Sequence, residues 1–280
     1  MADTISVEHV RPPRFAGRSY SEDPAALKKA VTALMPSAGT SGRALGVLVP
    51  HGPLHYSGRV AAAALAAATL EETLLVIGPN HAALGPRAAI VCEGAFALPG
   101  QVVAIDGHVA ESVRALAGLS EAPEVFAEDH GIETILPLLV AAQPRARIVP
   151  IAVHSLTAPM AARIGTSIAD AITGHGGGIT VVVTTDLAHY VASQDLDRLC
   201  LPVLEAAARL DPDALLSALS SREAIAGPRV EICGAGALLV AIFALRLLGA
   251  RPGSIVARGS SGEVSGESGL EVGYGSIVYA

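Results

Sequence analysis

The sequence contains no tryptophan, and aromatic residues make up only 3% of its 280 positions. Platforms for stacking nucleobases are therefore few, and the 19 Lys and Arg residues form no basic run, so we expect no nucleic-acid partner. Charged residues are also scarce at 16%, against 51% hydrophobic, which excludes an intrinsically disordered chain. The longest apolar run, Ala235 to Leu245, falls short of the ~20 residues that a membrane span needs.

Cysteine is scarce as well. Cys92, Cys200 and Cys233 are too few and too scattered for a disulfide framework, and the first residues lack the basic and apolar regions of a signal peptide. We therefore expect a cytoplasmic protein that is not bound to a membrane. Because no long linker interrupts the chain, we expect a single domain over residues 1–280, beginning with an irregular arm at 1–24.

Short apolar runs alternate along the chain with helical segments rich in alanine and leucine. Strands are expected at 45–49, 73–77, 88–92, 147–153, 179–184, 254–258 and 272–279. Helices are expected at 25–35, 60–70, 108–116, 131–142, 159–173, 195–219 (one or two helices) and 235–248. This alternation predicts an α/β fold with a largely parallel central sheet and helices on both faces. The last two strands suit an antiparallel hairpin at the edge of the sheet.

Ionisable side chains stand where several apolar runs end. His51, His81 and Asp186 each follow an expected strand, and Cys233 ends a further apolar run. Ligands of open α/β sheets bind outside the carboxyl ends of the strands, so we expect one shared site. Imidazole and thiolate suit iron, copper, zinc and nickel, which indicates a metal site. Taken singly, each histidine is more often a partner of backbone groups, and Cys233 is more often a small buried residue.

Two local patterns favour acid–base chemistry. If a helix begins at Asp186, then Asp186 and His189 project from one face, and the aspartate either orients the imidazole or binds a metal itself. His130 lies in the acidic stretch 128–133, just before an expected helix. Acidic neighbours would raise the protonated share of its imidazole, which suits an acid–base role.

Seven motifs in order along the chain resemble the Memo family, which in bacteria and archaea is also called AmmeMemoRadiSam system protein B. The motifs are Arg11 to Gly17 with Tyr20 and Pro24; Pro50-His51 to Gly58; Gly78 to His81; Asp129-His130 to Glu133 with Pro137; Val149 to Ile151; Thr185-Asp186 to His189-Tyr190; and Cys233-Gly234 with Gly273-Tyr274. They cover most of the chain, and the family is similar in fold to class III extradiol (LigB-type) dioxygenases.

The resemblance implies a ligand set and a pocket. In the dioxygenases two histidines and a glutamate hold non-haem Fe(II), and in Memo proteins a cysteine takes the place of the glutamate. By this resemblance His51, His81 and Cys233 bind the metal, with Fe(II) expected first and Cu or Zn as alternatives. His189, Asp186 and His130 line the same pocket as catalytic residues, and the substrate pocket is expected to include His55, Tyr56, Asn80 and Tyr190.

Three functions remain open on the sequence. The first is a metal-dependent oxidoreductase, a dioxygenase-like enzyme that uses O₂ on a small molecule. The second is an iron- or copper-binding protein without catalysis, favoured by the affinity of thiolate for Cu(I). The third is an interaction protein that binds a peptide or a partner enzyme of a radical-SAM-associated system. Alanine-rich helices are compatible with homo-oligomers but do not demonstrate them.

Overall fold

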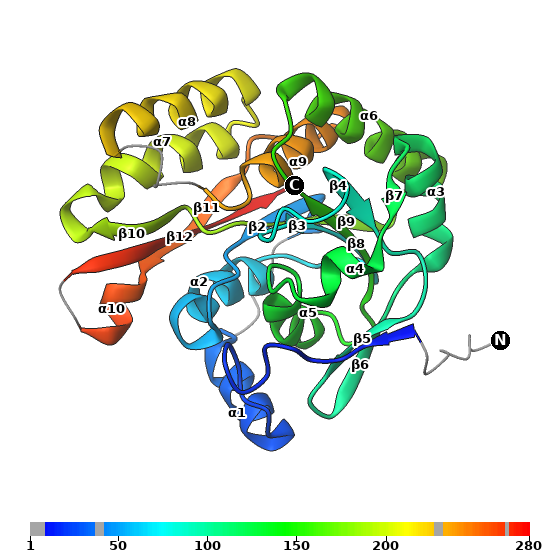
Figure 1. The fold of residues 1–280 in the computed structure, drawn as a ribbon, viewed down its shortest axis with the longest axis horizontal. Coiled ribbons are helices and arrows are strands. Elements are labelled where there is room, and N and C mark those ends of the chain that lie inside the picture. The colour runs from blue at the N-terminus through cyan, green and yellow to red at the C-terminus, as the bar shows by residue number, and fades with distance from the viewer. Residues whose placement is uncertain (1–8, 37–41, 227–231, 267–268) are drawn as a thin grey trace.

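A sheet of nine strands forms the centre of the computed structural model, which describes residues 9–36, 42–226, 232–266 and 269–280 (Figure 1). The strands run in the order β10-β12-β2-β9-β3-β8-β4-β7, and β11 also pairs with β12. Their bounds are β2 Gly46–Val49, β3 Thr73–Pro79, β4 Ala88–Ile90, β7 Ser120–Glu121, β8 Arg147–Val153, β9 Ile179–Thr184, β10 Ala188–Ala192, β11 Ser254–Ser260 and β12 Leu270–Tyr279.

The four central strands β2, β9, β3 and β8 are parallel. Almost all of their residues are buried, as their continuous apolar runs predict for strands covered on both faces. Leu48 pairs with Val183, and Val183 in turn pairs with Ile77, so β2, β9 and β3 end level with one another. The residues that follow these strands therefore meet at one edge of the sheet.

Helices cover both faces of the sheet (Figure 1). One face carries α3 Gly107–Ala117, α6 Ala158–Gly174, α7 Leu196–Ala208, α8 Pro212–Ala226 and α9 Ala235–Leu247. The other carries α1 Pro24–Leu34, α2 Leu54–Ala66, α5 Leu136–Ala142 and the short α10 Ser261–Ser265. Helices α6 and α9 pack closely at Gly165, where an added Cβ would lie 2.7 Å from the Val240 carbonyl oxygen.

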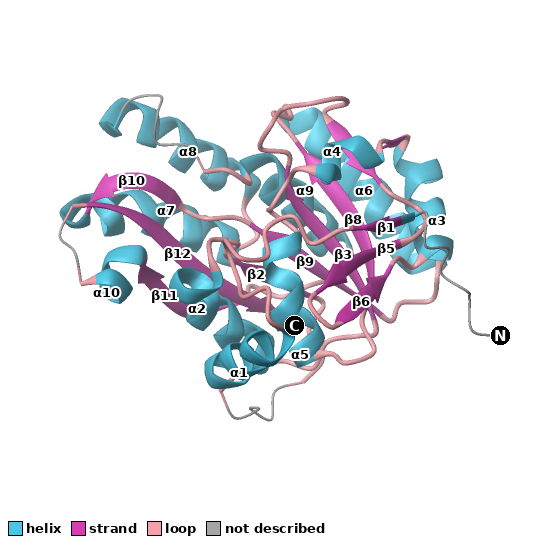
Figure 2. Ribbon diagram, turned by 60° about the horizontal axis from the view of Figure 1, so that its bottom comes forward, coloured by secondary structure: helices cyan, strands magenta, loops and turns pink. Residues whose placement is uncertain are grey.

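A second, three-stranded sheet lies beside the first (Figure 2). It consists of β1 Val10–Arg11, β5 Ala95–Leu98 and β6 Gln101–Ala104, and a bridge from Ile105 to Ile148 joins it to β8. The N-terminal arm thus contributes a strand to this sheet. The short helices α4 Pro123–Ala127, η2 Glu133–Ile135 and η3 Ser193–Asp195 complete the described elements.

The predicted α/β class is confirmed, and so are the expected strands at 147–153 and 179–184, whose bounds are unchanged. Three details differ. Helix α2 begins at Leu54 rather than at residue 60, because Pro53 takes the N-cap position, where a proline does not interrupt helical hydrogen bonds. The chain after Asp186 enters strand β10 instead of a helix. The hairpin β11–β12 is present, but β12 also pairs with β2 and β10 and so lies inside the sheet.

Candidate metal centre

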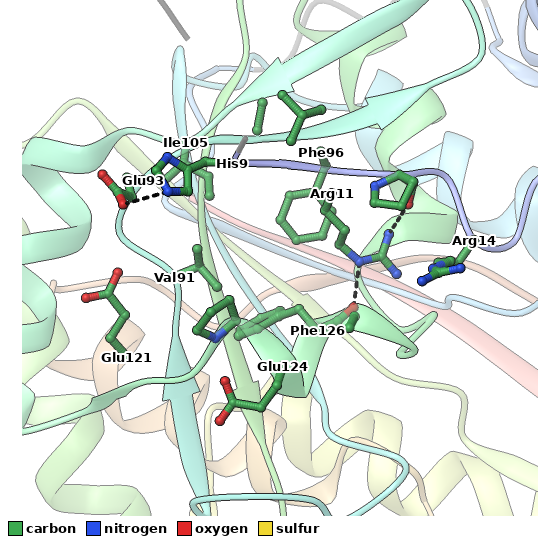
Figure 3. A pocket seen from close by; sticks show the side chains of 15 residues that line it. His9, Arg11, Arg14, Val91, Glu93, Phe96, Ile105, Glu121, Glu124 and Phe126 are labelled. Atoms are coloured by element: carbon green, nitrogen blue, oxygen red, sulfur yellow. Dashed lines mark hydrogen bonds and ion pairs between the residues drawn. The ribbon is translucent and has the colours of Figure 1, made fainter. Parts of the chain in front are cut away.

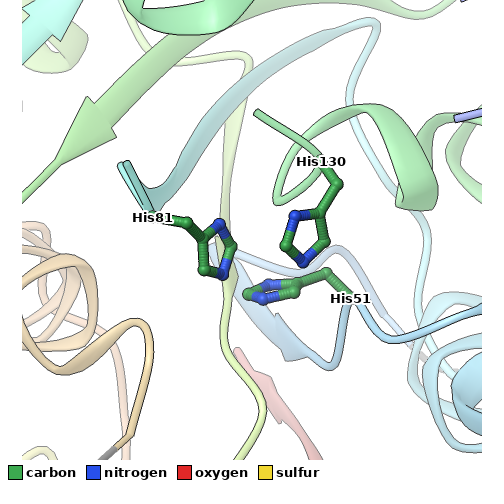
Figure 4. Close-up of side chains that lie close together, drawn as sticks. All are labelled: His51, His81 and His130. Carbon is green, nitrogen blue, oxygen red and sulfur yellow. The ribbon is translucent and has the colours of Figure 1, made fainter. Parts of the chain in front are cut away.

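Three imidazoles converge at the carboxyl ends of the central strands (Figure 4). His51 follows β2, His81 follows β3, and His130 lies in the loop between α4 and η2. One ligand atom from each ring lies within 4.8 Å of the others. The described part of the chain thus holds a candidate three-histidine metal site, at the edge of the sheet where the sequence predicts a shared site.

His51 is the most firmly held of the three. Its side chain is buried, its backbone N–H donates to Asp186 Oδ1 at 3.0 Å, and its carbonyl accepts from Thr134 Oγ1 at 2.7 Å. The Thr184 hydroxyl donates its one hydrogen to the Gly131 carbonyl, so toward His51 Nδ1 it can only accept. His51 therefore carries its hydrogen on Nδ1 and presents the Nε2 lone pair as an acceptor toward the site.

Burial sets the charge of His51. Desolvation lowers the pKa of this imidazole to about 3, and the nearby Asp186 carboxylate offsets only part of that effect. The ring is therefore neutral at ordinary pH. A neutral imidazole with a free Nε2 is the form that binds a metal ion.

His81 is held by a loop instead of by the sheet. Its Nδ1 lies 3.1 Å from both carboxylate oxygens of Asp129, and its backbone N–H donates to Asp129 Oδ2 at 2.7 Å. Burial tends to raise the pKa of Asp129, but His81 and the backbone N–H groups of Gly131 and His81 outweigh it and lower the pKa. The carboxylate therefore stays ionised and directs the other nitrogen of His81 toward the site.

His130 stacks on His81, with ring centroids 4.0 Å apart and an interplanar angle of 16°. Burial and the neighbouring His81 lower the pKa of His130, so the expectation that its acidic neighbours protonate it is wrong. Asp129 and Asp186 raise the pKa of His130, but burial and His81 outweigh them. The acidic groups next to His130 in the sequence are also engaged elsewhere. Asp129 faces His81, and Glu133 accepts from Arg11 Nη1 at 2.5 Å.

Cys233, predicted as a ligand together with His51 and His81, contacts His51 but is not part of the three-histidine cluster. Its Sγ is 3.2 Å from His51 Nε2 and accepts from the Asp186 backbone N–H at 3.3 Å. Burial, and after it the Asp186 carboxylate, raise the pKa of the thiol to about 12. The free protein therefore holds a thiol that donates to His51 Nε2, and a metal ion would have to displace this proton.

Asp186 links the two sides of the site. Its Oδ1 accepts from the backbone N–H groups of His51 and Gly52, and its Oδ2 lies 3.6 Å from His189 Nε2. Burial alone would raise the pKa of Asp186, but the His51 and His189 imidazoles lower it to about 2. The expected pairing of Asp186 with His189 is thus present, although it arises at the start of a strand and not on a helix.

The residues expected in the substrate pocket are spread over a wider area. Tyr190 is 73% exposed, and its ring centroid lies 6.3 Å from that of His189. Asn80 is buried beside His81, and its Nδ2 donates to the Leu84 carbonyl at 2.7 Å. His55 is exposed, and its ring packs 4.0 Å from Tyr56. His55 lines a cavity of about 580 Å³ beside the N-terminal arm, whose lining includes none of the three converging histidines.

One feature escaped prediction from the sequence, a buried carboxylate that holds the loop of His130. Glu133 is fully buried and accepts from the Tyr20 hydroxyl at 2.5 Å and from the Phe15 backbone N–H at 2.7 Å, besides its ion pair with Arg11. Arg11 also donates to the Phe126 and Asp129 carbonyls. The arm therefore clamps the loop that carries Asp129 and His130. More than 110 positions separate the partners, so no local pattern reveals the contact.

The family model described as Memo-like protein matches residues 11–278. A MEMO1 family protein from Caldivirga maquilingensis is 32% identical over 239 residues, which cover 84% of this chain and 83% of the relative. A MEMO1 family protein from Methanothermobacter thermautotrophicus is 28% identical over 281 residues, which cover 96% of this chain and 99% of the relative.

Among solved structures, the crystal structure of the uncharacterized protein JW3007 from Escherichia coli K12 is similar in fold, with a TM-score of 0.55 at 16% identity. The similarity covers 82% of this chain and 99% of that protein. The family match includes the arm, all three histidine loops and Cys233, so the clamp and the candidate metal centre both lie inside the matched region. This chain belongs to the Memo-like family.

Proposed function

We propose that this protein is a metal-dependent oxidoreductase, a non-haem Fe(II) dioxygenase-like enzyme that acts on a small molecule with O₂. One observation carries the proposal: imidazole nitrogens of His51, His81 and His130 lie within 4.8 Å of one another at the carboxyl edge of the sheet, and the Cys233 thiol contacts His51. Imidazole and thiolate donors favour iron or copper over the harder cations. The Thr184 hydroxyl is hydrogen-bonded to Nδ1 of His51, and the Asp129 carboxylate to Nδ1 of His81. Such hydrogen bonds commonly orient histidines that bind a metal.

The ring planes support His51, His81 and Cys233 as the ligands. A metal ion binds an imidazole nitrogen in the plane of the ring. His51 and His81 stand at 89° to each other, so their planes can meet at one ion. The stacked planes of His81 and His130 are nearly parallel and do not converge. Cys233 Sγ lies 3.2 Å from His51 Nε2, near the ~3.5 Å that separates two ligands of one tetrahedral ion.

An Fe(II) ion held there would supply a Lewis-acid and redox centre with open positions for the substrate and O₂. The chain supplies the proton chemistry. Asp186 stays ionised and holds the His189 ring, which reaches solvent and would carry a proton to or from the substrate. His130 is kept neutral by burial, so it would accept a proton from a bound substrate. The exposed Tyr190 ring beside His189 would contact that substrate.

The redox state of the cysteines and of the proposed iron supports a location in the cytoplasm. Cys92, Cys200 and Cys233 are all free thiols. A thiol ligand and an Fe(II) centre both need reducing surroundings, so we propose the cytoplasm. No helix in the described part of the chain is long and apolar enough to cross a bilayer.

Two measurements on protein prepared anaerobically without an affinity tag test the proposal. The first is the metal content of the wild type and of four variants: His51→Ala, His81→Ala, Cys233→Ala and His130→Ala. We expect about one iron per wild-type chain, loss of iron in the first three variants and retention in His130→Ala. His130→Ala is the matched control, because it removes an imidazole from the same cluster.

The second measurement separates an enzyme from a metal carrier. Nitric oxide binds Fe(II) at the open position that O₂ uses, and the complex has a distinct electron paramagnetic resonance signal. We expect this signal in the iron-loaded wild type. Bound iron without the signal would indicate a metal-binding protein that does not catalyse. A wild type that takes up no metal would overturn the proposal and favour a pocket for a peptide or partner protein.

A further inference from the structure

A second cavity lies apart from the histidines, between the two sheets (Figure 3). Strands β1 and β5 of the small sheet form one side, and the segments following β4 and around β7 and α4 form the other. Its volume is about 480 Å³, within the ~300–1,000 Å³ range of small-molecule sites. None of His51, His81, His130 or Cys233 lines it.

The walls of this cavity are apolar and aromatic. Phe96 and Phe126 meet edge to face, with centroids 6.4 Å apart, and both are buried in the core. Val91 and Ile105 also line it. An edge-to-face pair presents aromatic surface that favours a flat or alkyl group.

The rim carries more free negative than positive charge. Glu93, Glu121 and Glu124 all line the cavity, and Figure 3 shows their carboxylates away from the two arginines. Glu121 accepts a 3.4 Å hydrogen bond from the Cys92 backbone N–H and interacts electrostatically with Arg114. Within the described residues neither Glu121 nor Glu124 makes an ion pair. Glu93 faces His9 at 3.5 Å.

The cations of the cavity are already engaged. The Arg11 guanidinium donates hydrogen bonds to the Glu133 carboxylate and to the Phe126, Asp129 and Pro12 carbonyls. Arg14 pairs with Glu128 at 3.2 Å. An anionic ligand would therefore meet unpaired carboxylates and find no free guanidinium, whereas a cation would meet the opposite charge.

We propose that this cavity binds a small organic cation, an amine or quaternary ammonium with an aromatic or alkyl body. The body packs against Phe126, Val91 and Ile105, since the Arg11 guanidinium already lies over the Phe96 ring at 5.1 Å from its centroid. The cationic group lies at the rim beside Glu121 and Glu124. The site is separate from the metal centre, so its occupation does not depend on a bound metal. It does share Arg11 and Phe126 with the clamp on the His130 loop.

Calorimetric titration of the metal-free full-length protein with two matched probes tests the charge preference. The probes are 4-phenylbutylammonium and 4-phenylbutanoate, which share the same body and carry opposite charges. We expect the ammonium to bind at least about tenfold more tightly than the carboxylate. Equal affinity, tighter binding of the carboxylate or no binding of either probe would overturn the proposal.

Variants locate the binding. Glu121→Gln/Glu124→Gln removes the two rim charges that lie beside the bound cation, and we expect it to weaken ammonium binding about tenfold. Val91→Phe fills the cavity and should abolish binding while leaving the rim charges in place. Glu22→Gln, an exposed carboxylate outside this cavity, is the matched control and should bind like the wild type. Ammonium binding that the rim double variant leaves unchanged, or that Glu22→Gln weakens as much, would show that the cation binds elsewhere.

Discussion

The two halves of the candidate metal centre are held in different ways. His51 belongs to the sheet half: it is buried, and its ring and backbone bond to Thr184 at the end of β9 and to Asp186 just after it. His81 belongs to the loop half: a quarter of its side chain is exposed, and its partner Asp129 comes from a loop that the N-terminal arm clamps through Glu133. One half is positioned by the core of the fold, and the other by a loop that the N-terminal arm holds in place.

Because the two halves are held differently, the stability of the fold and the geometry of the site can be altered separately. The sheet half shares the hydrogen bonds and packing of the central strands, and two hydrogen bonds, from Thr134 to the His51 carbonyl and from Thr184 to the Gly131 carbonyl, connect it to the loop half. The loop half adds a requirement, because the arm must dock before Asp129 and His130 reach their places. Changes to the arm should therefore impair His81 and leave the Cys233–His51 contact in place.

The largest expected effect comes from removing the clamp. Glu133→Ala leaves Arg11 with an uncompensated charge, since only 10% of the Arg11 side chain is exposed. We expect the free energy of unfolding to fall by about 3–5 kcal/mol in urea titrations. Glu128→Ala, which breaks the exposed pair with Arg14, is the control and should cost less than about 1 kcal/mol. Similar losses in both variants would show that the clamp contributes no more than a surface ion pair.

The next largest effect is expected on metal affinity. Here the hydrogen-bond partners of His51 and His81 can be compared. Thr184→Val removes the acceptor of His51 Nδ1, and Asp129→Asn weakens that of His81. Each should reduce metal affinity about 10- to 100-fold in competition with a chelator. Thr184→Ser keeps the hydroxyl and should retain wild-type affinity. An unchanged affinity in Thr184→Val would mean that the sheet half does not orient its ligand through Nδ1.

Acid should destabilise the sheet half of the metal-free protein. The His51 pKa is about 3 in the folded state, so below the unfolded value of about 6.5 only the unfolded chain takes up this proton. Stability should fall with decreasing pH across that window, by up to about 1.4 kcal/mol per pH unit for this group. The Asp186 pKa of about 2 extends the loss from about pH 4 downward.

His51→Gln gives the comparison for this pH dependence. Chemical denaturation at several pH values should show a flatter profile between about pH 6.5 and 4 in the variant than in the wild type. Parallel profiles would contradict burial of a neutral His51.

The smallest effect on stability is expected at Tyr190, which belongs to neither half of the site. Tyr190 has a φ of +54°, a left-handed conformation that glycine adopts without strain, and its ring is mostly exposed. Tyr190→Gly should therefore change the free energy of unfolding by less than about 1 kcal/mol, in either direction, and leave metal affinity unchanged. A larger loss in thermal or urea unfolding would show that the ring packs on the site.

The sequence predicts the sheet half far better than the loop half. Buried parallel strands are continuous apolar runs, so their ends, and with them His51 and Asp186, are visible from local sequence. The position of His81 after β3 is visible in the same way, but its support by Asp129 is not. Strand β10 was missed because the spacing of Asp186 and His189 also fits a helix, and pairing with β12 decides between the two. The hairpin β5–β6 was missed too, since its strands are short and one is partly exposed. The roles of Thr184, Asp129 and Glu133 depend on contacts between distant segments.

The most direct test of the central claim is the absorption spectrum of the protein loaded with Co²⁺, which reports the ligand set. Binding by His51, His81 and Cys233 predicts visible bands of a low-symmetry site together with a near-ultraviolet band from thiolate to cobalt. The near-ultraviolet band should disappear in Cys233→Ser and persist in His130→Gln. A wild-type spectrum without the thiolate band, and visible bands that His130→Gln removes, would contradict this ligand set and identify the three histidines as the metal site.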